Sequence, residues 1–257
     1  MLDWWLPTNV ATFGEEIDWL FHLIYVITGI TFILVAGAFL AFLFIYRDRP
    51  GRRARYTHGS TPLEIAWTIA PTLILVILTF LSLPAWSRIK MSMPQTDFVV
   101  QVRAKQFNWE FIYPGPDGKF GTADDKSFLD ELHVPVGKPV RINLGARDVI
   151  HSFFVPNFRF KQDAVPGREI PAWFHVTKPG KYEAPCAELC GFGHSGMKAW
   201  VYVHAQADYD KWAAENLKAD ASPAVPTTAQ AKLDAPAEPA KPAAARAAGQ
   251  TEGKAKP

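Results

Sequence analysis

Two long apolar runs that contain no charged residue constrain this chain of 257 residues more than any other feature. They extend from Leu23 to Tyr46 and from Ile65 to Trp86. Each run is long enough to cross the hydrocarbon layer of a membrane as a helix of about 20 residues, and the internal Pro71 is tolerated in such a helix. A pair of buried helices in a soluble protein is the alternative, but uncharged stretches of this length favour the membrane. We therefore predict a transmembrane hairpin over residues 23–94.

The loop between the two runs predicts the orientation of this hairpin. Residues 47–60 carry five arginines against one aspartate, and a short basic loop of this kind is held on the cytoplasmic side. Residues 1–22 and everything after the second run are then expected outside, on the periplasmic face of a bacterial inner membrane. The four acidic residues among the first 18 do not resemble the basic start of a signal peptide, although the sequence leaves a processed leader open.

Residues 95–218 are predicted to form an outer domain made of strands. Segments rich in Val, Phe, Ile, Tyr and Trp alternate there with Pro, Gly and Asp turns. Many short strands at close spacing favour an all-β sandwich over a parallel α/β sheet. A short helix at 208–217 is expected to close the domain. The predicted strands are residues 98–104, 108–113, 132–134, 139–144, 169–176, 181–184 and 198–204.

The end of the chain and its overall charge argue against other functions. Residues 219–257 consist mainly of Ala, Pro and Lys, so they cannot bury enough apolar surface to offset the entropy of ordering, and a disordered tail is expected. The chain carries 27 basic and 25 acidic residues. Because this balance gives nucleic acid no electrostatic attraction, nucleic acid is not expected as a partner.

The only two cysteines of the chain lie in one short segment, CAELCGFGHSGM, at residues 186–197. Thiolate and thioether sulfur and imidazole nitrogen are ligands that suit copper. The segment offers Cys186, Cys190, His194 and Met197, and His151 supplies a second imidazole from far upstream. With two thiolates, such a site can hold two copper ions bridged by both sulfurs, each ion capped by one histidine and completed by a weak ligand.

Two other interpretations of these residues fit less well than a copper site. A disulfide between the two cysteines suits an oxidising compartment, but the neighbouring histidine and methionine favour a metal. Zinc fits less well because structural zinc sites use Cys and His without Met.

Residues 113–125 contain three aspartates but do not match a calcium-binding EF-hand loop. A solvated hairpin insertion is preferred there, and ion binding by that loop stays open.

The segment from Cys186 to Met197 resembles the CuA signature of cytochrome c oxidase subunit II. Residues 151–156 (HSFFVP) with 161–168 (KQDAVPGR) are similar to the first copper-ligand segment of that family, and residues 63–71 (LEIAWTIAP) are similar to the start of its second membrane helix. The resemblance covers about residues 1 to 215. It implies a two-helix transmembrane hairpin followed by an all-β, cupredoxin-like Greek-key sandwich.

This resemblance also implies a ligand assignment. Both cysteines would bridge two copper ions, with His151 and Met197 on one ion and His194 on the other. The backbone carbonyl of Glu188 would complete the second ion, and its carboxylate would reach a magnesium or manganese ion at the boundary with subunit I. Phe153, Phe154, Phe192 and Trp200 are expected to bury the centre and limit the access of water.

Three residues outside the ligand set are assigned roles by the same resemblance. Glu64 matches a glutamate at the mouth of a proton pathway into subunit I, although an acid favoured by the helix dipole is the alternative. Phe107 stands where the family presents a tryptophan to its electron donor, and a strand residue of the core is equally compatible. Asp148 matches an acidic docking position, but the outer domain as a whole has no strong acidic excess.

The function implied by this resemblance is electron transfer in respiration. A binuclear copper centre would accept electrons from a cytochrome c and pass them to haem in subunit I, where oxygen is reduced to water with proton translocation. Subunit III and membrane lipid are further expected partners. A quinol oxidase subunit II lacks the copper ligands, and the chain has no C-x-x-C-H haem attachment sequence. A membrane-tethered copper-binding protein or chaperone remains the alternative.

Overall fold

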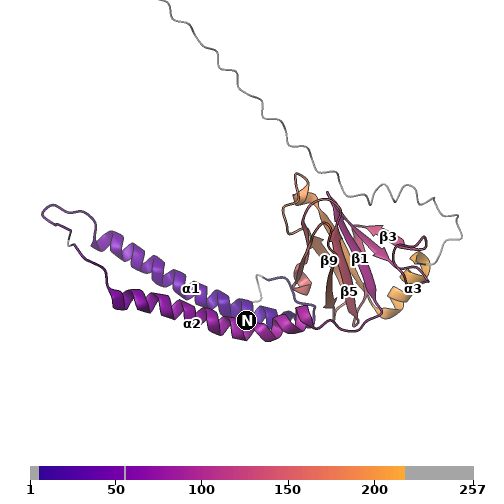
Figure 1. Ribbon diagram of the computed structural model, residues 1–257, viewed down its shortest axis with the longest axis horizontal. Coiled ribbons are helices and arrows are strands. Elements are labelled where there is room, and N and C mark those ends of the chain that lie inside the picture. Colours follow the sequence, from indigo (N-terminus) through magenta and orange to yellow (C-terminus); the bar gives the residue numbers. More distant parts are fainter. Residues whose placement is uncertain (1–5, 55, 218–257) are drawn as a thin grey trace, which may run out of the picture. The chain divides into compact units, whose positions relative to one another are not determined.

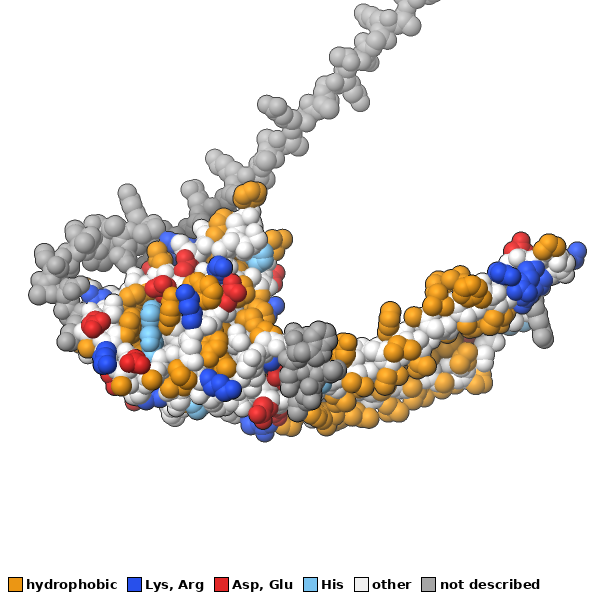
Figure 2. All heavy atoms as spheres, turned by 180° about the vertical axis from the view of Figure 1, so that it is seen from behind, with side chains coloured by type: hydrophobic (Ala, Val, Ile, Leu, Met, Phe, Trp, Pro, Cys, Tyr) orange, Lys and Arg blue, Asp and Glu red, His pale blue; other side chains and the backbone are white. Residues whose placement is uncertain are grey.

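Two long helices begin the part of the chain that the computed structural model describes, residues 6–54 and 56–217 (Figure 1). Helix α1 spans Gly14–Ile45, helix α2 spans Thr61–Trp86, and a short π-helical turn, η1, follows at Ser87–Met91. Both helices are long and apolar enough to cross a membrane. In Figure 2 apolar side chains cover this hairpin, and Lys and Arg side chains gather at the end of the connecting loop.

Both helices begin before the apolar runs that predicted them. The first turn of α1 contains Glu15 and Glu16, and the first turn of α2 contains Glu64. Acidic side chains in the first turn are stabilised by the helix dipole, so a helix extends through polar residues that hydropathy alone leaves out. Pro62 is the second residue of α2, in the first turn, where proline is tolerated because no intrahelical N–H bond is lost there.

Ten strands follow the hairpin and form the outer domain. The largest sheet has the order β3-β2-β1-β5-β8, a second has the order β4-β10-β9, and β6 pairs with β7. A last helix, α3 (Gln206–Asn216), follows β10. The strands are β1 (Val99–Lys105), β2 (Asn108–Tyr113), β3 (Lys126–Leu129), β4 (Glu131–Pro135), β5 (Pro139–Ala146), β6 (His151–Val155), β7 (Phe160–Ala164), β8 (Ile170–His175), β9 (Gly180–Pro185) and β10 (Lys198–His204).

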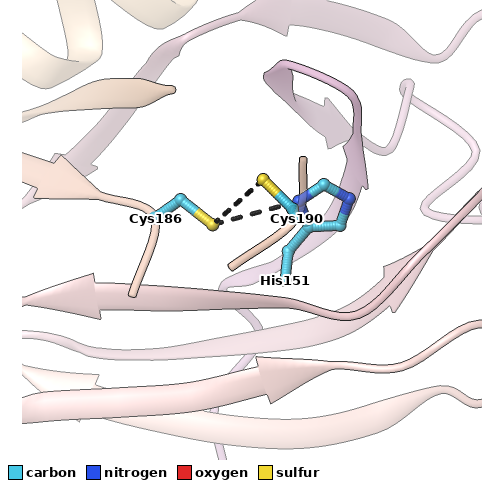
Figure 3. A group of neighbouring side chains, drawn as sticks. All are labelled: His151, Cys186 and Cys190. Atoms are coloured by element: carbon cyan, nitrogen blue, oxygen red, sulfur yellow. Dashed lines mark hydrogen bonds between the residues drawn. The ribbon is translucent and has the colours of Figure 1, made fainter. Parts of the chain in front are cut away.

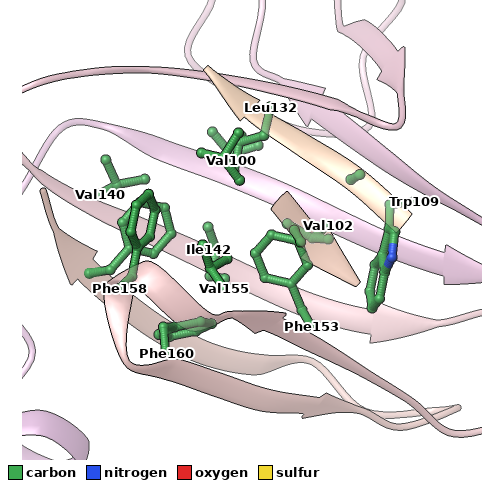
Figure 4. Packing of buried hydrophobic residues seen from close by; sticks show 14 of the residues in the cluster. Val100, Val102, Trp109, Leu132, Val140, Ile142, Phe153, Val155, Phe158 and Phe160 are labelled. Atoms are coloured by element: carbon green, nitrogen blue, oxygen red, sulfur yellow. The ribbon is translucent and has the colours of Figure 1, made fainter. Parts of the chain in front are cut away.

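The two larger sheets share one apolar core, as a sandwich requires. In β1, β2 and β10 every second side chain is buried, which follows from the two-residue period of a strand. Trp109 from β2, Phe153 from β6 and Leu132 from β4 are fully buried in this core (Figure 4). Phe111 from β2 is fully buried as well. The predicted architecture, two apolar helices followed by a β-sandwich, is confirmed.

Three strands were missed by the sequence analysis, and each lacks the alternation that predicts a strand. Strand β3 has only four residues and no fully buried position. Four of the five residues of β6 are buried, and β7 carries polar residues in its centre. The predicted disordered tail, residues 219–257, lies outside the described residues.

Residues before α1 join the sandwich. Ala11 forms a β-bridge with Val176, and the backbone N–H of Val10 donates to the carbonyl of Asn157 at 3.0 Å. Val10, Ala11 and Phe13 are buried in the core of the sandwich. The segment before the first apolar run therefore contributes to the outer domain, a role that the sequence analysis did not assign.

Candidate metal centre

The predicted ligands on the cysteine segment are held by the loop that joins β9 to β10. The backbone N–H of Cys186 donates to the carbonyl of Met197 at 2.9 Å and closes this loop at its base. Gly191 has a φ of +132°, and a Cβ atom at this position would lie 2.7 Å from the Nε2 atom of Gln106. Glycine is favoured here because residues with a side chain rarely adopt this positive φ. The tight loop directs both thiols inward.

His151 reaches the loop from the first position of β6. A β-bridge joins Phe153 to Cys186, and the N–H of Ala187 donates to the carbonyl of Ser152 at 3.0 Å. These backbone contacts bring two segments together that lie 35 residues apart in sequence. In Figure 3 the side chains of His151, Cys186 and Cys190 point toward one another.

The six predicted donor atoms converge. The two Sγ atoms lie 3.9 Å apart, and both cysteines are free. Cys186 Sγ lies 3.9 Å from the Nδ1 atom of His151 and 3.3 Å from the backbone oxygen of Glu188. Cys190 Sγ lies 3.6 Å from the Nδ1 atom of His194 and 3.7 Å from the Sδ atom of Met197.

Burial makes this cluster unfavourable as a set of bare ionised thiols. His151 is 0% exposed, Met197 1% and Cys190 3%. Burial, and then the neighbouring Cys186, raise the pKa of the Cys190 thiol to about 11. A bound cation would offset this penalty, because a metal replaces the thiol proton and neutralises the buried thiolate. Two thiols, two imidazoles and one thioether are the donor set that copper prefers, so the residues fit the copper that the sequence predicts.

Asp148 determines which nitrogen of His151 is available to a metal. The Nε2 atom of His151 lies 2.8 Å from Asp148 Oδ1 and donates to it. The backbone N–H groups of Gln106 and Val149 also donate to this carboxylate, each at 2.7 Å. Burial raises the pKa of Asp148, but these hydrogen bonds outweigh it and hold the pKa below its usual value. The carboxylate therefore leaves the Nδ1 lone pair of His151 facing the sulfurs.

The four aromatic residues expected to cover the centre differ in how far they are buried. Phe153 is fully buried, while Phe154 and Trp200 are partly exposed. Phe192 is completely exposed, so the expectation that it shields the centre is wrong. Its backbone belongs to the outer part of the ligand loop, between two glycines.

The other predicted functional residues lie in different surroundings. The carbonyl of Glu188 faces the centre, while its side chain is exposed. Phe107 is 38% exposed in the turn between β1 and β2, and its ring packs against Gly193 so closely that a Cβ there would meet it at 2.5 Å. Glu64 lies in the first turn of α2, on an exposed face of the helix that it shares with Thr61 and Thr68.

The sequence analysis missed two residues that contact the centre. The amide of Gln106 donates to the carbonyl of Cys190 and so links the β1–β2 turn to the ligand loop. Trp109 packs edge to face against the His151 ring at 6.1 Å between centroids. Both residues are close in sequence to Phe107, but sequence proximity does not reveal contacts across the sandwich.

Comparisons with known proteins agree with this geometry. Residues 4–85 match the profile of the cytochrome c oxidase subunit II transmembrane domain, and residues 112–204 match that of its periplasmic domain. The chain is 32% identical to cytochrome c oxidase subunit 2 of Thermostichus vulcanus, over 86% of this chain and 81% of the relative.

Two further relatives show similar coverage. The alternative cytochrome c oxidase subunit 2 of Bradyrhizobium diazoefficiens is 32% identical, over 81% of this chain and 82% of the relative. A probable cytochrome c oxidase subunit 2 of Rickettsia bellii is 35% identical, over 79% of this chain and 80% of the relative. On the strength of its two apolar helices, its sandwich domain and this shared length, the chain is a membrane protein that belongs to the cytochrome c oxidase subunit II family.

Proposed function

We propose that this chain is the electron-accepting subunit of a respiratory cytochrome c oxidase, with a binuclear CuA centre in its periplasmic domain. Electrons from a cytochrome c enter at the ligand loop and leave for haem in subunit I, where oxygen is reduced to water with proton translocation. The observation that carries this proposal is the convergence of two buried thiols with two imidazole Nδ1 atoms, one thioether and one carbonyl. When bound, a copper pair would supply a one-electron redox couple shared across both sulfurs.

The ligands are proposed to divide between two ions. Cys186 and Cys190 would hold both ions, His151 and Met197 would hold one of them, and His194 with the carbonyl of Glu188 would hold the other. The sandwich contributes rigidity: Asp148 holds the His151 ring from behind, and the bond at the base of the loop fixes both of its ends. Little ligand movement on oxidation or reduction is what a fast electron-transfer site needs, because any rearrangement of the ligands adds to the barrier.

The direct test replaces one bridging sulfur in the purified oxidase. We expect Cys190→Ser to abolish the electron paramagnetic resonance signal of a copper pair, which shows hyperfine structure from two equivalent nuclei. Ser195→Ala is the matched control, since Ser195 lies on the same loop with an exposed side chain and should leave that spectrum unchanged. A normal spectrum in the Cys190 variant, or a wild-type protein that carries zinc or one copper ion, would refute the proposal.

A second ion is proposed at the boundary with subunit I. The Glu188 side chain is exposed next to the copper ligands, and its carboxylate has no hydrogen-bond partner within residues 6–54 and 56–217. A hard carboxylate oxygen suits magnesium or manganese. In oxidase purified from cells grown with manganese, Glu188→Gln should remove the electron paramagnetic resonance signal of bound manganese. The copper spectrum should stay intact, because copper would use only the backbone oxygen of this residue. Retention of manganese by the variant would contradict this assignment.

Glu64 is proposed as the mouth of a proton pathway into subunit I. Its carboxylate lies with two threonine side chains on an exposed face of the first turn of α2, beside the arginine-rich loop, where it could take protons from the cytoplasm. Glu64→Gln should slow turnover of the full oxidase without changing the copper spectrum or the reduction of copper by the donor. Unchanged turnover would favour the alternative, a residue that only stabilises the helix end.

A further inference from the structure

The six metal donors differ in how the backbone that carries them is held. Three of them lie within a strand or directly beside one: His151, Cys186 and Met197. The other three lie on residues 188–196, here called the loop tip, which contain a single 3-10 turn and no strand: Cys190, His194 and the carbonyl of Glu188. Half of the donor set is therefore fixed by the sheets, and the other half depends on what holds the loop tip.

The loop tip has few attachments to the rest of the domain. Its backbone bonds are local: the N–H of His194 donates to the carbonyl of Gly191 at 3.1 Å, and the N–H of Gly196 donates to the carbonyl of Gly193 at 3.0 Å. Apart from contacts among the donors themselves, a single hydrogen bond within residues 6–54 and 56–217 joins the tip to another segment. It runs from the side-chain amide of Gln106 to the carbonyl of Cys190.

Packing reinforces this hydrogen bond. A Cβ atom on Gly191 would lie 2.7 Å from the Nε2 atom of Gln106 and 3.2 Å from the Phe107 ring. A Cβ atom on Gly193 would lie 2.5 Å from the same ring. The two glycines thus let the turn between β1 and β2 lie directly on the backbone of the loop tip, and the amide of Gln106 supplies the directional contact between them.

Gln106 also reaches the other half of the donor set, through its backbone. Its N–H donates to Asp148 at 2.7 Å, and Asp148 accepts from the Nε2 atom of His151 at 2.8 Å. The side chain of Gln106 therefore acts on Cys190, while its main chain acts on His151. A side-chain substitution at this position removes the first connection and leaves the second, because the N–H remains.

We propose that Gln106 is a positioning residue of the copper centre: its side-chain amide fixes the loop tip, and so sets where Cys190 and His194 lie relative to the strands. This inference rests on the proposed function, because it concerns the ion that His194 and the Glu188 carbonyl would hold. Ligands that are in place before the metal binds need no ordering when it binds, which favours affinity. Without the amide, the ion on the His194 side is held more weakly than the ion on the His151 side.

The first test compares variants of the whole purified oxidase by chelator competition and electron paramagnetic resonance. Gln106→Met keeps the length of the side chain but removes the donor. Its copper affinity should fall roughly tenfold, as is usual when a residue that orients a metal ligand is lost. At intermediate chelator concentrations its spectrum should show hyperfine structure from one copper nucleus, because the ion on the His194 side leaves first.

Two further variants serve as rescue and control. Gln106→Lys, whose ammonium group can still donate to the Cys190 carbonyl, should retain hyperfine structure from two equivalent nuclei. Gln206→Met removes an exposed amide hydrogen bond of the same kind, to Asp210 at 2.7 Å, and should behave as wild type. The inference is overturned by unchanged copper affinity in Gln106→Met, by simultaneous loss of both ions from it, or by a Gln106→Lys variant that loses copper in the same way.

Hydrogen exchange of the copper-free full chain separates the attachment of the loop from copper binding. In Gln106→Met, exchange in residues 188–196 should be about threefold to tenfold faster, as expected when local opening breaks one hydrogen bond fewer. Exchange in the sheets should stay as in wild type, which shows that the variant folds. Unchanged exchange in the loop tip overturns the inference.

The two measurements together distinguish failure of this inference from failure of the proposed function. If the wild-type oxidase holds a copper pair and Gln106→Met keeps it with normal affinity, only the role of Gln106 falls. If the loop tip loosens as expected but the wild-type oxidase holds no copper pair, the proposed function falls, while the attachment of the tip by Gln106 stands.

Discussion

Two pairs of histidines in the same sandwich differ in what their nitrogens face. At the copper end, His151 and His194 direct Nδ1 toward sulfur. Beside α3, the Nδ1 atom of His133 lies 2.9 Å from the Nε2 atom of His204. The two rings are inclined by only 11° with centroids 5.2 Å apart, so they lie edge to edge and share one N–H···N hydrogen bond.

The contrast shows how a ligand differs from a structural histidine. Trp212 and Tyr202 flank the His133 ring at 4.3 and 4.7 Å between centroids, and its nitrogen is satisfied by a neighbouring imidazole. At the copper end the imidazoles face soft sulfur atoms that cannot satisfy them well as hydrogen-bond partners. Histidine count alone does not distinguish the two sites; the atom that each nitrogen faces does.

The largest expected effect is loss of copper-dependent stability. Copper at a thousandfold excess over its dissociation constant should stabilise the domain by about 4 kcal/mol, because it binds only the folded ligand set tightly. Cys190→Ser should abolish this gain and His133→Gln should retain it, as measured by thermal unfolding of the full chain with and without copper. Equal stabilisation by copper in both variants would contradict the assignment of copper to the site of Cys190.

A smaller effect is expected from the carboxylate behind His151. Asp148→Asn should lower copper affinity by roughly 10- to 100-fold, which is the usual consequence of removing a residue that orients a metal ligand. Competition with a chelator of known affinity measures the change. Asp163→Asn, on neighbouring β7, is the control. An unchanged copper affinity in Asp148→Asn would mean that the backbone of the sandwich orients the His151 imidazole without the carboxylate.

At the structural pair, Trp212→Ala should reduce the free energy of unfolding by about 2 kcal/mol. Trp212 packs on His133 and lies 5.3 Å from the Phe128 ring centroid, and truncating a fully buried tryptophan costs about 3 to 5 kcal/mol; partial exposure lowers the figure. Denaturant unfolding measures it, with the exposed Lys211→Ala as control. Loss of the copper spectrum in Trp212→Ala would show that the two sites are coupled.

The smallest effect should appear as a pH dependence. Burial, and then the neighbouring His204, lower the pKa of His133 to about 4. Below about pH 6.5, His133 binds a proton in the unfolded state but stays neutral in the folded state. The free energy of unfolding should therefore fall as pH drops from about 6.5 to 4, by on the order of 1 kcal/mol after solvent screening. His133→Gln should flatten the curve of unfolding free energy against pH in this window. An unchanged slope would assign the titration to other groups.

Local patterns made part of this protein predictable. The membrane hairpin follows from two uncharged runs, since the length of an apolar segment decides whether it can span a bilayer. The ligand types followed from one segment, because four of the five side-chain donors lie within residues 186–197, and their chemical preference for copper does not depend on the fold. Alternation likewise predicted β1, β2 and β10, whose side chains point by turns into the core and out of it.

Other features required contacts between residues far apart in sequence. The role of Asp148 behind His151, the exposure of Phe192 and the partnership of His133 with His204 are each decided by what packs alongside. The sequence by itself therefore determined the membrane anchor and the chemistry of the ligands, because both depend on the nature of nearby residues. Only the tertiary structure decided which nitrogen is free, which acids are already paired and which apolar side chains stay exposed, because burial and hydrogen bonding are properties of the space around a side chain.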